Sequence, residues 1–231
     1  MPTVVAMGGG GFDPLLDGLI LSLARSASGR DRPRVAFLGT ASGDSPGYVA
    51  SFYEAFARYS EASQLSLFDR TVDDIEGFLG EQDVVYVGGG NTENMLAIWR
   101  VHGVDRALRR AWQAGTVMTG QSAGSLCWFE TGTTDSFGVG LAALSGGLGF
   151  VPGSHAPHYD SEATRRPHYQ RLIADGVLPA GHAADDGAAL VFHGTELGEV
   201  VASRPDARGY RVERGADGAA IETVLPVRYL G

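Results

Sequence analysis

Short apolar runs alternate with helix-like segments over the first half of the chain, and this rhythm limits the fold more than any other feature. Such alternation favours a mostly parallel sheet with helices on both faces. The sequence therefore predicts an α/β fold. The expected strands are Thr3–Met7, Arg34–Leu38, Leu65–Phe68, Val84–Val87 and Thr116–Thr119, and the expected helices are Leu15–Ala27, Tyr48–Tyr59, Val72–Leu79 and Glu93–Ala114.

The pattern changes near the C-terminus, where short apolar runs are separated by Gly, Pro and Asp. We expect these runs to be antiparallel strands at the edge of the sheet. No linker divides the chain, and 231 residues with 44% hydrophobic content can bury a sizeable core. The sequence predicts a single domain over residues 1–231. The C-terminal runs are Ala188–Phe192, Glu199–Ala202, Tyr210–Glu213 and Ala219–Val224.

A serine stands between two glycines immediately after the fifth expected strand. Gly120-Gln121-Ser122-Ala123-Gly124 has the G-x-S-x-G spacing of a nucleophile elbow. Small neighbours let the backbone form a strained strand-to-helix turn that exposes the serine Oγ. The segment Ala123–Phe129 is expected to form a helix, and its first N–H groups would favour a developing oxyanion.

Two further glycine turns follow expected strands. Gly88-Gly89-Gly90 precedes Asn91-Thr92, and its N–H groups can point at a carbonyl oxygen, while Asn91 or Thr92 can cap the next helix. Turns at the ends of successive strands share one crevice in an open α/β sheet. The run Gly8–Gly11 resembles a dinucleotide turn, but Asp13 replaces the third glycine of that pattern, so we interpret the run as a structural turn or a wall of the site.

A nucleophilic serine needs a base, and the base needs an orienting acid. His155, His158 and His168 cluster after Gly153, and the residues alone do not rank His158 above His155. The remaining histidines are His102, His182 and His193.

Two adjacent aspartates are candidates for the acid. Asp185 and Asp186 form a turn before the apolar run Ala188–Phe192, from which a carboxylate could reach back to an imidazole.

Taken together, Gly88–Thr92, Gly120–Gly124 and Pro157-His158-Tyr159 resemble the peptidase E family of serine dipeptidases, which is related to cyanophycinase. The resemblance runs from Met7 to about Val191 and is greatest to the longer bacterial members. It implies a class I glutamine amidotransferase-like, or flavodoxin-like, sheet. It also implies that Ser122 is the nucleophile, His158 the base and Asp186 the acid, with Asp185 and Asp135 as alternatives for the acid.

The same resemblance suggests which groups contact the substrate. The N–H groups of Gly90 and Ala123 would hold the oxyanion, and Asn91 would contact the substrate. Asp135, or alternatively Asp160, would receive the substrate amine, and Arg165 would meet an N-terminal aspartyl side chain. The expected reaction is hydrolysis of dipeptides or other short peptides through an acyl-enzyme. The alternatives are a cyanophycinase-like hydrolase of aspartyl-arginine links and a non-catalytic binding or sensor module.

Composition removes several other functions. The net charge of −9 and the pI of about 5.1 argue against nucleic acid or an anionic membrane as a partner. All 18 basic residues are Arg, so the chain has no lysine nucleophile. Cys127 is the single cysteine, which excludes an internal disulfide and a multi-cysteine metal site, and we expect it to be a buried thiol. We expect no metal or cofactor. The expected partner is a small peptide, the expected location is the cytoplasm, and the chain is compatible with a homodimer.

Overall fold

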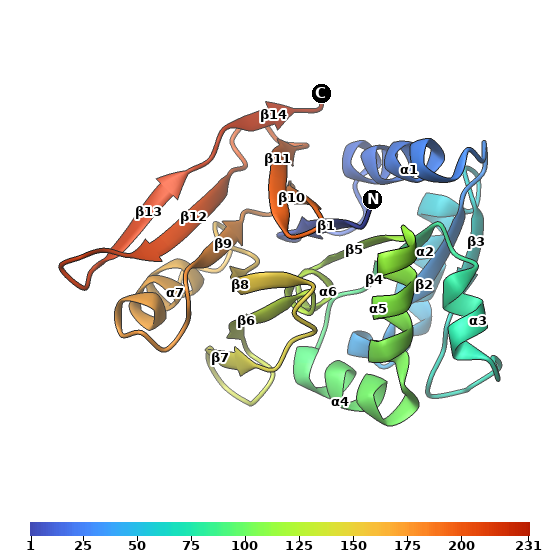
Figure 1. Cartoon of the computed structure of the whole chain (residues 1–231), viewed down its shortest axis with the longest axis horizontal. Helices are drawn as coiled ribbons and strands as arrows, with labels where there is room; N and C mark the ends of the chain where they lie inside the picture. Colours follow the sequence, from blue (N-terminus) through green and yellow to red (C-terminus); the bar gives the residue numbers. More distant parts are fainter.

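In the computed structural model, which describes residues 1–231, the strands form two sheets (Figure 1). The larger sheet has the order β14-β11-β10-β1-β5-β4-β2-β3. Its strands are β1 (Thr3–Met7), β2 (Arg34–Leu38), β3 (Glu61–Gln64), β4 (Val84–Val87), β5 (Val117–Gln121), β10 (Ala188–His193), β11 (Glu196–Ala202) and β14 (Val227–Tyr229).

The larger sheet is mostly parallel, as the sequence predicts. Strands β3, β2, β4, β5 and β1 run parallel, whereas β10 is antiparallel to β1 and β11 is antiparallel to β10. The short β14 then pairs in parallel with β11. The expected α/β fold is therefore confirmed, with Ala188–Phe192 and Glu199–Ala202 as antiparallel strands at the sheet edge. The expected strands Tyr210–Glu213 and Ala219–Val224 form instead as β12 (Gly209–Arg214) and β13 (Ala220–Val224) of a second sheet, because β12 pairs with β9 (Gly181–Ala184).

Helices cover both faces of the larger sheet. Neighbouring strand residues such as Val4 and Val5 belong to different core clusters, because successive side chains of a strand point to opposite faces. One face packs against α1 and α2, and the other packs against α3, α4, α5 and α6. The helices are α1 (Pro14–Ser28), α2 (Pro46–Phe56), α3 (Ile75–Gly80), α4 (Thr92–His102), α5 (Val104–Ala114) and α6 (Ala123–Leu126), with a 3₁₀ turn η1 (Thr40–Ser42).

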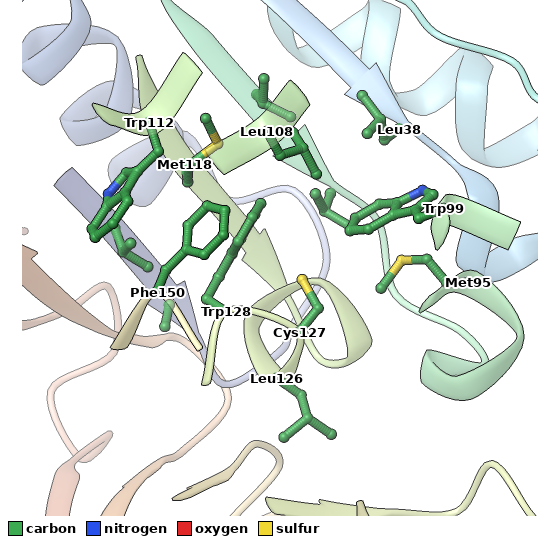
Figure 2. Close-up of a cluster of buried hydrophobic side chains, with 14 of the residues drawn as sticks. Leu38, Met95, Trp99, Leu108, Trp112, Met118, Leu126, Cys127, Trp128 and Phe150 are labelled. Carbon is green, nitrogen blue, oxygen red and sulfur yellow. The ribbon is translucent and has the colours of Figure 1, made fainter. Parts of the chain in front are cut away.

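The core on the α4–α5 face is rich in aromatic rings. Figure 2 shows Trp112 and Phe150 side by side, and their ring centroids are 4.8 Å apart in a stacked arrangement. Cys127 lies fully buried in the same cluster, as expected, and burial raises the pKa of its thiol. A neutral thiol inside the core is a packing group rather than a nucleophile.

The second sheet was not expected from the sequence. It has six strands in the order β13-β12-β9-β8-β6-β7, and helix α7 (Arg165–Ala174) packs beside it. Glycine and polar residues are frequent in these strands, so their alternation is weak. They are β6 (Phe129–Thr134), β7 (Ala142–Ser145), β8 (Val151–Ala156), β9 (Gly181–Ala184), β12 (Gly209–Arg214) and β13 (Ala220–Val224).

Three expected elements differ from the structure. The third strand is Glu61–Gln64 rather than Leu65–Phe68, because it is a polar edge strand, while Leu65 and Leu67 enter the core from the following loop. The single expected helix Glu93–Ala114 is two helices, divided at Gly103, whose φ of 72° is left-handed. The expected helix Ala123–Phe129 ends at Leu126, since Phe129 pairs with Val151 in the second sheet. None of the helices has the length and apolar character needed to cross a bilayer.

Candidate active site

The register of four adjacent strands brings the sequence motifs to one edge of the larger sheet. Val87 at the end of β4 pairs with Gly120 of β5, so the turn Gly88–Gly90 lies beside Ser122. Met7 at the end of β1 pairs with Gln121 on one side and with Ala189 at the start of β10 on the other. The turns that follow β4, β5 and β1 therefore lie beside the turn that precedes β10, and Asp186 is in that last turn.

Ser122 has the backbone of a nucleophile elbow. Its φ of 55° and ψ of −119° fall in a region that L-residues rarely adopt. A Cβ on Gly120 or Gly124 would lie 2.5 Å or 2.1 Å from the carbonyl oxygen of Val87, so both flanking positions require glycine. The strained turn places Ser122 at the N-terminus of α6, as the G-x-S-x-G pattern predicts.

His158 and Asp186 form a hydrogen-bonded pair. The Nδ1 of His158 lies 2.7 Å from Oδ1 of Asp186, and both side chains are about three-quarters buried. This hydrogen bond lowers the pKa of Asp186, so its carboxylate stays ionised and accepts from Nδ1–H. The Nε2 atom of the imidazole is then left as the proton acceptor, as a general base requires.

The backbone around His158 is fixed by the turn after β1. His158 has a φ of 53°, and its N–H donates to the carbonyl oxygen of Gly8 over 3.1 Å. A Cβ on Gly9 would lie 2.3 Å from Oδ1 of Asp186 and 2.3 Å from Cε1 of His158. Gly8 and Gly9 are thus a wall of the site, because the Gly8 carbonyl oxygen accepts from the His158 N–H and Gly9 lies against the histidine and aspartate side chains. The hydrogen bond that His158 makes is the one to Asp186, and none joins it to Ser122 Oγ.

The main chain of Asp186 is held at both ends by one ion pair. Asp160 Oδ1 accepts from the Asp186 N–H at 2.8 Å, and Arg204 Nε donates to the Asp186 carbonyl oxygen at 2.9 Å. Arg204 and Asp160 also contact each other at 2.6 Å. Both carboxylate oxygens of Asp160 are therefore engaged within the chain, which differs from its expected place beside the substrate amine. Arg204 carries no sequence signal and was not anticipated.

Asp185 faces away from His158. Its Oδ2 accepts from the Arg208 N–H at 2.8 Å and from the Tyr210 hydroxyl at 3.1 Å. Burial raises the pKa of Asp185 to about 6. Of the two adjacent aspartates, only Asp186 contacts the imidazole.

His155, the other histidine that the sequence leaves open, is fully buried in β8. Its Nε2 lies 3.1 Å from Ser125 Oγ, and its Nδ1 lies 3.1 Å from the carbonyl oxygen of His182. The ring stacks on Phe129 with centroids 4.5 Å apart. Burial lowers the pKa of His155 to about 3, so it is a neutral, hydrogen-bonded core residue.

The turn after β4 carries a backbone donor with no partner. The N–H of Gly90 makes no hydrogen bond within the chain, and its φ of 139° suits only glycine. Asn91 caps α4 by accepting from the Asn94 N–H at 2.9 Å, and its amide donates to the carbonyl oxygen of Ser136. These bonds engage the Asn91 amide with the backbone, as expected for an N-cap, which differs from its expected place as a substrate contact.

The same contacts bring the loop after β6 to the Gly90 turn. Ser136 Oγ accepts from the first N–H groups of α4, at Thr92 and Glu93. Asp135, next to Ser136, is exposed, and its carboxylate has no hydrogen bond within the chain. A free carboxylate therefore lies on a loop that is fastened to the turn beside Ser122.

Arg165 does not face the crevice, contrary to the expectation that it meets a substrate aspartyl group. Its side chain is only 4% exposed, because it packs against β6 at the start of α7. Nε and one terminal nitrogen donate to Glu162 Oε2, and the other terminal nitrogen donates to the carbonyl oxygen of Thr133. These contacts engage all three guanidinium nitrogens within the chain. Nor does the chain group three or more His, Cys, Asp or Glu side chains in a way that could hold a metal ion.

The chain is similar in sequence to known peptidases. Residues 4–200 match the model of Peptidase family S51. The chain is 49% identical over 233 residues to the uncharacterized peptidase YgaJ of Bacillus subtilis (strain 168), and the match covers all of both chains.

Two solved structures share the fold. A peptidase from an acI-B1 Actinobacterium superposes with a TM-score of 0.71 at 16% identity, covering 98% of this chain and 95% of that one. A "Putative Peptidase E Protein" from Listeria monocytogenes EGD-e superposes with a TM-score of 0.61 at 19% identity, covering 85% and 96%.

Proposed function

Because the chain belongs to peptidase family S51, which makes it a serine peptidase, we propose that Ser122, His158 and Asp186 are its catalytic triad. The observation that carries the proposal is the 2.7 Å hydrogen bond between His158 and Asp186 at the sheet edge where the strained Ser122 turn also lies. A serine, an imidazole and an orienting carboxylate are the three groups that acyl transfer needs.

The reaction begins when Ser122 Oγ attacks the scissile carbonyl carbon and its proton passes to His158 Nε2. The carbonyl oxygen becomes an oxyanion, which accepts hydrogen bonds from the N–H groups of Gly90 and Ala123. His158 then donates the proton to the departing amine, the C–N bond breaks, and an acyl-enzyme remains. A water molecule attacks the ester in the same way and releases the acid.

The substrates are short peptides with a free N-terminus. The support is Asp135, an exposed and unpartnered carboxylate on the loop that is tied to the Gly90 turn. A carboxylate there can accept charge-assisted hydrogen bonds from a terminal ammonium but not from an acetylated amide of the same shape. With Arg165 buried, the chain offers no cation at that position for an aspartyl side chain, so a preference for Asp-Xaa peptides does not follow from Arg165.

The test combines a dipeptide panel with labelling by a fluorophosphonate that reacts with activated serines. Wild type should be labelled and should cleave dipeptides, whereas Ser122→Ala should lose labelling and lower kcat by about 10⁴ or more. His158→Ala should approach the same loss, since the two residues act as a unit. The matched control is Cys127→Ala, which removes a buried thiol five residues from Ser122 and should keep nearly full turnover.

Four results would contradict the proposal. Absence of labelling and turnover in wild type would favour a non-catalytic binding module. Turnover in Ser122→Ala would exclude the serine mechanism. Cleavage of acetylated or longer peptides at the rate of free dipeptides would favour an endopeptidase, and cleavage of aspartyl-arginine links would favour a cyanophycinase-like hydrolase.

A further inference from the structure

One tyrosine hydroxyl joins the turns on either side of the serine. Tyr48, on α2, accepts a hydrogen bond from the Gly89 N–H at 3.1 Å and another from Gln121 Nε2 at 2.8 Å. Gln121 directly precedes Ser122, and its Oε1 accepts from the Gly11 N–H at 2.8 Å. Tyr48 and Gln121 therefore cross-link the turns that follow β1, β4 and β5.

The direction of these hydrogen bonds is determined by the groups themselves. An amide N–H can only donate, so the Tyr48 oxygen accepts from Gly89. Gln121 Oε1 must be the atom that faces Gly11, and Nε2 must then face Tyr48. Both acceptor sites of the hydroxyl are occupied. Burial raises the pKa of Tyr48, so the phenol stays neutral in this role.

The Gly90 N–H belongs to a peptide group that lies between two anchored neighbours. On one side the Gly89 N–H is held by Tyr48. On the other side the Asn91 N–H donates to the carbonyl oxygen of Ala41 at 2.8 Å. The direction of the unpartnered Gly90 N–H thus depends on the Tyr48 hydrogen bond.

We propose that Tyr48 is a positioning residue that holds the Gly90 N–H and the Ser122 turn in register for the oxyanion. The inference rests on the proposed function, because it gives Gly90 its role as an oxyanion donor. Tyr48 acts through Gly89 and Gln121 and does not itself touch the reacting atoms. A displaced donor weakens oxyanion stabilisation much as a missing donor does, although less completely.

Removal of the hydroxyl can be separated from loss of packing. The Tyr48 ring packs edge-on against Phe37 and Phe12, with centroids 5.2 Å and 5.6 Å away, and phenylalanine keeps these contacts. Tyr53, one turn along the same helix, is half-buried, packs against Phe52, and its hydroxyl has no hydrogen bond within the chain. Tyr53→Phe is therefore the matched control for Tyr48→Phe.

The experiment measures kcat and KM on the best dipeptide, Tm, and inhibition by a peptide boronate, whose tetrahedral adduct places a negative oxygen where the oxyanion forms. Tyr48→Phe should lower kcat by about 10- to 100-fold with KM within about twofold, and should weaken the boronate by a similar factor. Its Tm should stay near that of Tyr53→Phe, which should match wild type in all assays.

Each other outcome overturns the inference. Unchanged kcat and boronate affinity in Tyr48→Phe would show that the hydroxyl does not direct the oxyanion donor. A raised KM with unchanged kcat would make Tyr48 a substrate contact, and a kcat loss matched by a large fall in Tm would make it a packing residue. Failure of the proposed function is distinguishable, because wild type itself would then lack Ser122-dependent turnover.

Discussion

Replacing Asp17 by Asn should make the protein more resistant to unfolding as the pH rises. Asp17 lies on α1 with only 6% of its surface exposed, and its Oδ1 is buried without a hydrogen-bond partner. Burial, together with the negative charge of Asp13, raises the pKa of Asp17 from its ordinary value of 3.8 to about 7. The native state therefore holds a proton that the unfolded state releases at lower pH.

The sign and the magnitude follow from this difference. Below about pH 4 the Asp17 carboxyl is protonated in both the native and the unfolded state, so its ionisation does not lower the unfolding free energy. Between about pH 4 and about pH 7 the unfolded state loses this proton while the native state keeps it, so stability falls steadily; above about pH 7 both states are ionised and the loss is complete. A rise from 3.8 to about 7 amounts to about 4 kcal/mol at about 1.4 kcal/mol per pKa unit. An asparagine amide at this site is also poorly satisfied, but its cost does not vary with pH.

The assay is urea denaturation of wild type and Asp17→Asn at pH 4 and pH 8. The difference between their unfolding free energies should change by about 4 kcal/mol in favour of the variant between the two pH values. Asp31→Asn is the control, because Asp31 is exposed and its difference from wild type should be nearly independent of pH. A difference for Asp17→Asn that stays constant with pH would refute the reasoning.

Three further predictions concern the site. Asp186→Asn should lower kcat by about 10²-fold or more because it disturbs the histidine tautomer, whereas Asp185→Asn should leave kcat within a few-fold. Both values are measured at saturating substrate, and equal losses would remove Asp186 from the triad. Arg165→Ala should lower the unfolding free energy by about 2 kcal/mol, because it removes buried charge-assisted hydrogen bonds. It should change kcat/KM equally for Asp-Xaa and neutral dipeptides, and a selective loss on Asp-Xaa peptides would restore the role of Arg165 in substrate recognition. Asp135→Asn should raise KM for free dipeptides without changing Tm, and N-acetylation of the substrate should abolish cleavage by wild type; an unchanged KM would place the amine elsewhere.

Much of the larger sheet can be read from local sequence. Each expected parallel strand except the third coincides with an apolar run, because a strand covered by helices on both faces is apolar throughout. The glycine turns can be read in the same way, since tight turns beside a nucleophile demand glycine whatever surrounds them. The candidate nucleophile Ser122 and the turn of Gly90 are therefore visible in the sequence.

The second sheet and the side-chain partners depend on tertiary structure. The strands β6, β8 and β9 carry glycine and polar residues, so apolar and polar side chains do not alternate clearly along them. Their pairing depends on how the segments between them bring the strands side by side. Asp185 and Asp186 are adjacent and chemically identical, so only the direction of the turn before β10 decides which one meets His158.

The same holds for contacts between distant residues. Arg165 could bind a substrate carboxylate by its chemistry, but the position of α7 against β6 turns it toward Glu162. Tyr48 contacts Gln121, 73 positions away in sequence, because the first turn of α2 lies against the Gly88-Gly89 turn after β4. Local composition determined which backbone turns this chain can make, whereas the packing of elements distant in sequence decided which side chains those turns bring together.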